Sequence, residues 1–237
     1  MSKPRLDVCI SPLLLPLFKL EEYIVVAIDI LRATSTITVA LDHGVEKIIP
    51  VDTVEKCLAY KDKGFLLAAE RNGHKYPGFE FGNSPLDYQN DSVKGKTLVL
   101  TTTNGTYAVE KSKHALQVLT SSFLNLEATT DYLIDRSDNV LLLCAGWKDQ
   151  VNFEDTLFAG AAADILRPHF LIESDAVWGS LTLYRQSKKN VMRVLRNSSH
   201  FTRLNSLGMD DDIDYCLSLN LHPIVTGLVN GAIVKMQ

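Results

Sequence analysis

The sequence predicts an α/β fold, a three-layer arrangement in which mainly parallel sheets are flanked by helices. Short apolar runs rich in β-branched residues alternate along the chain with segments of helical character. The runs are continuously apolar, which is typical of strands buried on both faces of a parallel sheet. With 237 residues, 46% of them hydrophobic and 22% charged, the chain is long enough to bury a substantial core.

The apolar runs place the expected strands, and the segments between them place the helices. Strands are expected at Tyr23–Ile28, Lys47–Val51, Phe65–Ala69, Thr97–Leu100, Ala115–Leu119 and Val140–Leu143. Helices are expected at Ala33–Asp42, Val54–Asp62, Thr106–Ser112, Leu124–Ile134 and Asp155–Leu166. The apolar stretch Val8–Phe18 contains two prolines and predicts an opening strand followed by a turn. From Ile172 onward we expect a mostly helical part, with helices in Trp178–Arg196 and Asp210–Leu219.

The order of these elements also suggests an internal duplication. Residues 20–70 and 95–146 each give the pattern β-α-β-α-β, although the two halves share little sequence. A true structural repeat and the ordinary rhythm of α/β proteins both account for this pattern, so we treat 1–237 as a single domain. A polar loop, 71–96, separates the halves, and its length favours a functional role.

Charge and cysteine content narrow the class of protein. The formal net charge is −4, so we expect no nucleic-acid or membrane partner, and an anionic ligand would need a local site. The four cysteines are far apart and show no CxxC spacing, which indicates reduced thiols. The N-terminal apolar stretch is too short to span a bilayer. We therefore expect a cytoplasmic protein that acts on a small molecule, and homo-oligomerisation is left open.

Polar residues gather directly after the predicted strands. The C-terminal ends of parallel strands face a common crevice where ligands bind, so this enrichment favours a site over simple turns. Individual hydroxyls such as Thr34, Ser35 and Ser122 are equally explained as helix caps. The segments concerned are Asp29–Thr36, Glu70–Gly73, Thr101–Thr106, Thr120–Ser122 and Cys144–Gly146.

Two kinds of residue in these segments suit an anionic ligand. Thr101–Thr106 stands between a strand and a helix, where backbone N–H groups and the helix dipole favour an anion, with mere capping as the equal alternative. Arg32 and Arg71 each follow a strand, and the planar guanidinium pairs with phosphate, carboxylate or sulfonate. A surface ion pair is the alternative for either arginine.

Four carboxylates are candidate metal ligands: Asp29, Glu70, Glu154 and Asp155. Magnesium takes few carboxylates together with water and phosphate oxygens, and this set provides them. Asp29 ends a buried strand, where an uncompensated carboxylate is costly. Glu154 and Asp155 open a helix, so favourable charge at a helix N-terminus is the alternative for that pair. His200 is a candidate acid, base or substrate contact, although a lone histidine at a helix start is more often structural.

Six ordered motifs resemble those of the 2-phosphosulfolactate phosphatase family. They run from Asp29 to about Ala163, and Ser199-His200 has a weaker counterpart. Phe158 stands where a cysteine is usual in the family, which argues against a catalytic duty at that position. The matching segments are Asp29–Ile37, Glu70-Arg71, Gly78–Pro85, Thr101–Thr106, Ser121–Asn125, and Cys144–Gly146 with Glu154–Thr156.

The resemblance implies a magnesium-dependent phosphohydrolase that releases sulfolactate and phosphate, an activity known from coenzyme M biosynthesis. Two alternatives stay open: a phosphatase of another small anionic phosphate monoester, and a non-catalytic anion-binding protein of the same fold. We expect Mg²⁺ to be held by Asp29 with Glu154 and Asp155. The expected catalytic residues are Asp29, Arg32, Glu70, Glu154 and Asp155. The expected substrate contacts are Arg32, Arg71, Asn83, Ser84, Thr103, Asn104, Gly105, Thr106, Ser121 and Ser122.

Overall fold

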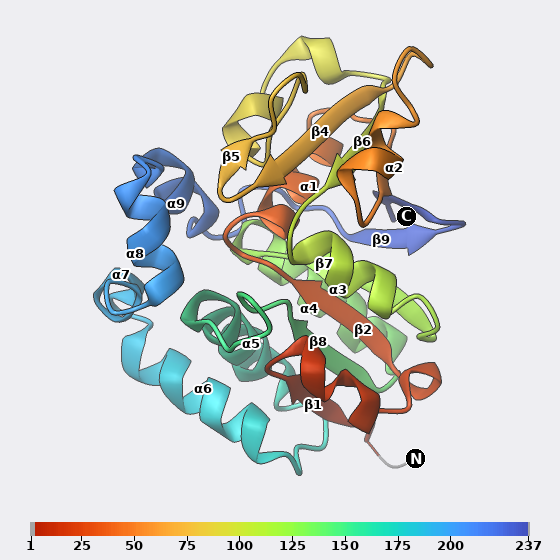
Figure 1. Ribbon diagram of the computed structural model, residues 1–237. Coiled ribbons are helices and arrows are strands. Elements are labelled where there is room, and N and C mark those ends of the chain that lie inside the picture. The colour runs from red at the N-terminus through yellow and green to blue at the C-terminus, as the bar shows by residue number, and fades with distance from the viewer. Residues whose placement is uncertain (1–2, 237) are drawn as a thin grey trace.

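The computed structural model describes residues 3–236, and residues 1, 2 and 237 of the expected domain lie outside it. The described chain is an α/β protein with a ten-stranded, mostly parallel mixed sheet, flanking helices and a C-terminal group of helices (Figure 1). The predicted fold class is confirmed. No helix among these residues is both long and apolar enough to cross a membrane.

The expected strands and helices are all present, with α2 shorter than predicted. The strands are β1 (Leu6–Cys9), β2 (Ile24–Ile28), β3 (Lys47–Pro50), β4 (Leu66–Arg71), β5 (His74–Lys75), β6 (Thr97–Thr101), β7 (Gln117–Ser121), β8 (Val140–Cys144), β9 (Thr226–Val229) and β10 (Ala232–Lys235). The α-helices are α1 (Ala33–Asp42), α2 (Val54–Leu58), α3 (Gly105–Lys111), α4 (Leu126–Arg136), α5 (Phe153–Leu166), α6 (Asp175–Ser187), α7 (Val191–Leu195), α8 (Ser199–Ser206) and α9 (Asp210–Cys216). Short 3₁₀ helices include η1 (Pro12–Leu17) and η3 (Pro85–Tyr88).

The sheet consists of two groups of parallel strands joined by an antiparallel hairpin. Its order is β1-β8-β2-β7-β9-β10-β3-β6-β4-β5. Because the pairings β7–β9, β9–β10 and β10–β3 are all antiparallel, the two parallel groups run in opposite directions. In Figure 1, β4 and β6 lie at the top and β1, β2 and β8 at the bottom. Each group mixes strands from both expected halves, since β2 lies between β7 and β8 while β6 lies between β3 and β4. The duplication stays a prediction.

The hairpin β9–β10 adds two strands to the C-terminal part, which we expected to be mostly helical. Helices α6 to α9 are present as expected, but the last described residues enter the sheet. The connection is Asn230-Gly231, with φ of 50° and 80°. A two-residue turn that needs positive φ at both positions selects this residue pair, because Asn and Gly adopt that backbone conformation at low cost. The turn signal was therefore available in the sequence.

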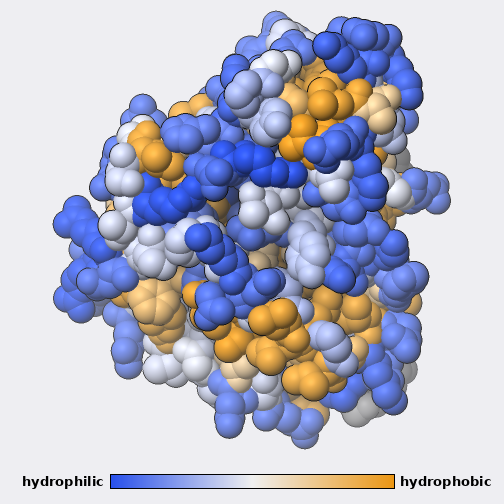
Figure 2. Space-filling model, in the orientation of Figure 1, coloured by the Kyte–Doolittle hydropathy of each residue, from blue (hydrophilic) through white to orange (hydrophobic). Residues whose placement is uncertain are grey.

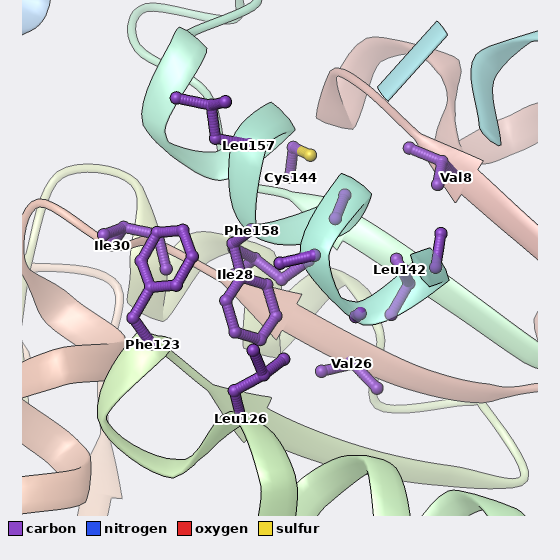
Figure 3. Close-up of a cluster of buried hydrophobic side chains, with 14 of the residues drawn as sticks. Val8, Val26, Ile28, Ile30, Phe123, Leu126, Leu142, Cys144, Leu157 and Phe158 are labelled. Atoms are coloured by element: carbon purple, nitrogen blue, oxygen red, sulfur yellow. The ribbon is translucent and has the colours of Figure 1, made fainter. Parts of the chain in front are cut away.

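Apolar side chains fill the space between the sheet and its helices. In one cluster Phe158 of α5 packs edge-to-face on Phe123, with ring centroids 5.4 Å apart (Figure 3). Ile28, Ile30 and Cys144 belong to the same buried cluster. Phe158 thus has a packing role at the position where the family usually has cysteine. The cysteines Cys9, Cys57, Cys144 and Cys216 are free and buried, as expected for reduced thiols.

Candidate active site

A cavity lies where the C-terminal ends of β2, β4, β6 and β8 come together, with α8 forming one wall. Four of the five expected strand ends therefore contribute, and the end of β7 does not. Polar side chains gather across the middle of this face of the molecule, between apolar patches near the top and bottom (Figure 2). The polar residues lining the cavity are Asp29, Arg32, Glu70, Asn72, Asn83, Thr103, Asn104, Trp147, Lys148, His200 and Arg203.

Asp29 is held at the end of β2 by hydroxyl and glycine residues around it. The Thr34 hydroxyl donates to the Asp29 carbonyl at 2.9 Å and accepts from the Asp29 N–H at 3.1 Å. Ala33 N–H donates to Asp29 Oδ1 at 3.3 Å. A Cβ on Gly105 would lie 2.8 Å from Asp29 Oδ2 and would clash with Ala33, so only glycine lets the start of α3 approach. The ends of β2 and β6 thus meet at the Asp29 carboxylate.

Burial dominates the electrostatics of Asp29 in the cavity. The pKa of Asp29 is raised from 3.8 to about 6, with burial as the largest cause; His200 and the Ala33 N–H lower it, and the Glu70 and Glu154 carboxylates raise it by smaller amounts. A buried carboxyl group relieves such repulsion either by keeping its proton or by binding a metal ion. Asp29 is therefore suited to a bound proton or cation.

Glu70 faces the cavity and Arg71 does not. Glu70 Oε1 accepts from Gly73 N–H at 2.5 Å. Because β4 continues through Arg71, beyond the predicted end at Ala69, successive side chains point to opposite faces of the sheet. The Arg71 guanidinium donates to Thr101 Oγ1 at 3.1 Å and to the Glu70 carbonyl at 2.6 Å. Arg71, which we expected to contact the sulfonate or the carboxylate of the substrate, is thus turned away from the cavity.

Arg32 reaches the cavity wall, but its charge is paired. Its guanidinium forms a buried ion pair with Asp212 of α9 and donates to the Gly73 carbonyl at 2.7 Å. Ser84 donates to the other oxygen of Asp212 at 2.6 Å. Asp212 therefore fixes two residues that we expected to contact substrate directly. Sequence patterns carry no local signal for Asp212, because 180 residues separate it from Arg32.

Glu154 is completely buried behind His200 rather than exposed to the cavity. Glu154 Oε1 lies 2.6 Å from His200 Nδ1, and Ser198 donates to Oε2 at 3.2 Å. His200 itself lines the cavity, and its ring stacks on Trp147 with centroids 5.5 Å apart. A carboxylate that engages one ring nitrogen fixes the orientation of the imidazole and leaves Nε2 for a ligand.

Asp155 ties two strand-end loops together. Its Oδ1 accepts from Ile30 N–H at 2.9 Å, and its Oδ2 accepts from Gly146 N–H and Asn152 Nδ2, both at 3.0 Å. Asp155 is completely buried and does not line the cavity. Both oxygens are thus committed to donors from the loops after β2 and β8 and from the cap of α5.

The Thr101–Thr106 segment divides into capping and cavity-facing residues. Thr102 Oγ1 accepts from Thr106 N–H at 3.1 Å, and the Thr106 hydroxyl donates back to the Thr102 carbonyl at 3.0 Å. Thr103 and Asn104, which lie between Thr102 and Thr106 in the sequence, line the cavity. The capping interpretation therefore holds for Thr102 and Thr106, and anion binding by Thr103 and Asn104 stays a prediction.

Comparison with known proteins shows the family to which the chain belongs. The model of a family described as 2-phosphosulpholactate phosphatase matches residues 9–231. The chain belongs to this family. A Thermotoga maritima protein is 41% identical over 212 residues, covering 90% of this chain and 92% of the relative. Relatives from Carboxydothermus hydrogenoformans, 40% identical with 86% of each chain covered, and Caldanaerobacter subterraneus, 39% identical with 92% of each covered, are similar. All three are named "Probable 2-phosphosulfolactate phosphatase".

Membership of the 2-phosphosulpholactate phosphatase family confirms the resemblance seen in the motifs and the expectation of a phosphoric monoester hydrolase. The structure brings six expected site residues to the cavity: Asp29, Arg32, Glu70, Asn83, Thr103 and Asn104. The expected residues that do not line it are Arg71, Ser84, Gly105, Thr106, Ser121, Ser122, Glu154 and Asp155. Ser121 and Ser122 lie at the end of β7, where Asn125 accepts from the Ser121 hydroxyl and the Ser122 N–H.

Proposed function

We propose that the chain hydrolyses 2-phosphosulfolactate, or a closely related phospho-acid, to sulfolactate and phosphate. The observation that carries the proposal is the cavity itself, where two carboxylates and the turn after β6 lie at meeting strand ends and His200 of α8 forms part of the wall. The names of the family and of its relatives support the choice of substrate.

We include Mg²⁺ in the proposal because the donors lining the cavity suit a hard cation. Among residues 3–236, no three His, Cys, Asp or Glu side chains form a cluster arranged to hold a metal. Magnesium, however, keeps several waters and uses one or two carboxylates with substrate phosphate oxygens. Asp29 and Glu70 line the cavity, and Asn83 Oδ1 is buried with no hydrogen-bond partner in the described chain. Asp29 and Glu70 would hold the ion, which when bound neutralises charge on the phosphoryl oxygens.

His200 would supply the proton that the leaving group requires. During hydrolysis the bond between phosphorus and the substrate's carbon-bound oxygen breaks, phosphorus gains a bond to an oxygen derived from water, and the carbon-bound oxygen takes up a proton. Because Nδ1 of His200 faces Glu154, Nε2 is the ring atom available for this transfer. Glu154 acts through His200 as a positioning residue, and Ser198 holds Glu154.

The phosphate would be bound by the turn after β6 and by the remaining donors of Arg32. Thr103 and Asn104 stand at the start of α3 and line the cavity. Arg32 uses one N–H group on Asp212 and one on Gly73, and a guanidinium has five such groups. The ion pair with Asp212 holds the guanidinium in place and offsets part of its charge.

Phosphate release from a panel of phospho-acids tests the proposal. We expect turnover of 2-phosphosulfolactate that is lost with chelator and restored by Mg²⁺. Turnover of another phospho-acid but not of 2-phosphosulfolactate would assign a different small monoester as substrate. Binding of these compounds without phosphate release under any condition would support the anion-binding alternative.

A further inference from the structure

Three residues form a cationic and aromatic corner of the cavity. The Lys148 ammonium lies 4.8 Å from the centroid of the Trp147 ring, and the Arg203 guanidinium carbon lies 5.8 Å from the same centroid. His200 stacks on this indole with an angle of 15° between the rings. Trp147, Lys148 and Arg203 all line the cavity, and we call them the Trp147 corner.

The positive charge of the Trp147 corner has no acidic partner in the described part of the chain. Neither Lys148 nor Arg203 forms an ion pair with a carboxylate of residues 3–236, whereas Arg32 is paired with Asp212. Lys148 is exposed and Arg203 is half-buried, so both cations are available to an anionic ligand group that enters the cavity.

The backbone presents Lys148 in an uncommon conformation. Trp147 and Gln150 exchange two backbone hydrogen bonds of 3.0 Å each, and the two residues between them, Lys148 and Asp149, have φ of 53° and 60°. Positive φ is uncommon for residues other than glycine and costs free energy, so the surrounding structure must hold the turn. Ser11 donates to the Asp149 carbonyl at 2.7 Å, and Asp155 binds Gly146 just before the turn.

Arg203 stands one helical turn after His200 on α8. Residues three apart on a helix lie on the same face with Cβ atoms about 5–6 Å apart. His200 is the group proposed to protonate the leaving oxygen. Arg203 therefore lies on the side of the cavity where that oxygen would bind. In 2-phosphosulfolactate the sulfonate is carried on the carbon next to the one that bears the leaving oxygen.

We propose that the Trp147 corner binds the sulfonate of the substrate, one of the two acid groups that the reaction leaves unchanged. The proposal rests on the proposed function. The three sulfonate oxygens accept hydrogen bonds from both cations, and the adjoining methylene group packs on the indole. Guanidinium is weakly hydrated, which favours its pairing with a weakly basic anion. The corner thus takes the role that we had expected of Arg71.

Binding of three small anions to the Mg²⁺-free protein tests this subsite without requiring turnover. The probes are 3-sulfolactate, isethionate, which lacks the carboxylate, and lactate, which lacks the sulfonate. In calorimetry at constant salt, Arg203→Met and Lys148→Met should each weaken 3-sulfolactate and isethionate binding by on the order of tenfold, while lactate binding changes less than twofold. Arg196→Met, directly after α7, and Lys189→Met, both exposed, are the matched controls and should have no effect.

Three results would overturn the subsite: no binding of sulfonate probes to the unaltered protein, unchanged isethionate binding in both variants, or an equal loss for lactate. Circular dichroism confirms that the variants are folded. Failure of the proposed function is a separate result, because it appears as absent phosphate release by the unaltered protein. Release of phosphate with unchanged sulfonate binding in both variants would reject the subsite alone.

Discussion

Asp29 and Asp155 are both buried aspartates at the site, but their roles differ. Asp155 is enclosed and receives three N–H donors on its two oxygens, so its carboxylate serves to hold loops. Asp29 receives one long bond from Ala33 N–H and faces the cavity. Burial raises the pKa of both carboxyl groups, but only Asp29 is placed to exchange its proton for a ligand.

At residue scale, Asp29→Asn should stabilise the chelated protein at neutral and alkaline pH. The pKa of Asp29 is raised from 3.8 to about 6 in the folded state, so the native protein holds this proton when the unfolded chain has lost it. Stability therefore falls as pH rises from about 4 to about 6 and stays low above that range. Asn avoids this penalty, on the order of 1–3 kcal/mol. Thermal melts of both proteins with chelator, from pH 4.5 to pH 8, measure this difference in stability.

The gain from Asp29→Asn should therefore be largest above pH 6 and shrink toward pH 4.5. Asp131→Asn, an exposed change on α4, is the control. Added Mg²⁺ should raise the melting temperature of the unaltered protein more than that of Asp29→Asn. A variant no more stable than the unaltered protein at pH 8 would mean that the carboxylate is compensated in the fold.

A second residue-scale prediction concerns His200. His200→Asn should lower kcat for 2-phosphosulfolactate by about 10²–10⁴-fold, the usual contribution of a positioned acid. The loss should be much smaller for an aryl phosphate, because a phenolate leaves without a proton. Glu154→Gln should give a smaller loss and shift the pH profile, since Glu154 only orients the ring. Steady-state kinetics with both substrates measure the ratio, with exposed His169→Asn as control. Equal losses on both substrates would remove His200 from the proton-transfer step.

At element scale, α9 is connected to the site through the buried carboxylate of Asp212. Asp212 pairs with Arg32 and accepts from Ser84, so it links α9 to the loop after β2 and to the loop before η3. Removing one partner of a buried pair leaves the other charge without compensation. Helices α8 and α9, seen at the left of Figure 1, thus help to shape the cavity wall.

Asp212→Ala should accordingly lower the free energy of unfolding by about 3–5 kcal/mol. Its neighbour Asp211 is exposed in the same first turn of α9. Asp211→Ala should cost no more than about 1 kcal/mol, the value of a charge near a helix N-terminus. Urea denaturation of both variants gives the difference. Similar stabilities for the two would show that Arg32 finds another partner.

The same elements show what the sequence could and could not predict. Continuous apolar runs located the strands, and the polar residues after them located the cavity, because both are local properties of the chain. Arg71 was misplaced because β4 continues two residues beyond Ala69, and successive side chains of a strand point to opposite faces. The residues of the pair Arg32–Asp212 are 180 positions apart, so no periodic pattern in the sequence indicates their contact. The unused signal was Asn230-Gly231, which marks the hairpin.

At the scale of the whole molecule, one hydrophobic cluster crosses both strand groups. It includes Val25 and Leu143 from one group, Ile48 and Leu98 from the other, and Ile233 of β10 between them. Ile233 is completely buried and pairs with Ile48 across the β10–β3 ladder. Because the active-site cavity lies at the strand ends of both groups, its geometry depends on this shared core and on the hairpin that joins the sheet.

Ile233→Ala should therefore destabilise both strand groups together. The expected cost is about 2–5 kcal/mol, the range for a large buried aliphatic side chain replaced by alanine. Hydrogen exchange should show the same loss of protection in β2 and β8 as in β4 and β6, because unfolding of a shared core is cooperative. Val229→Ala, on the exposed side of β9, is the matched control and should change stability by less than about 0.5 kcal/mol. Loss of protection in one group with the other unchanged would show that the hairpin joins two separately folding units, each of which carries half of the cavity.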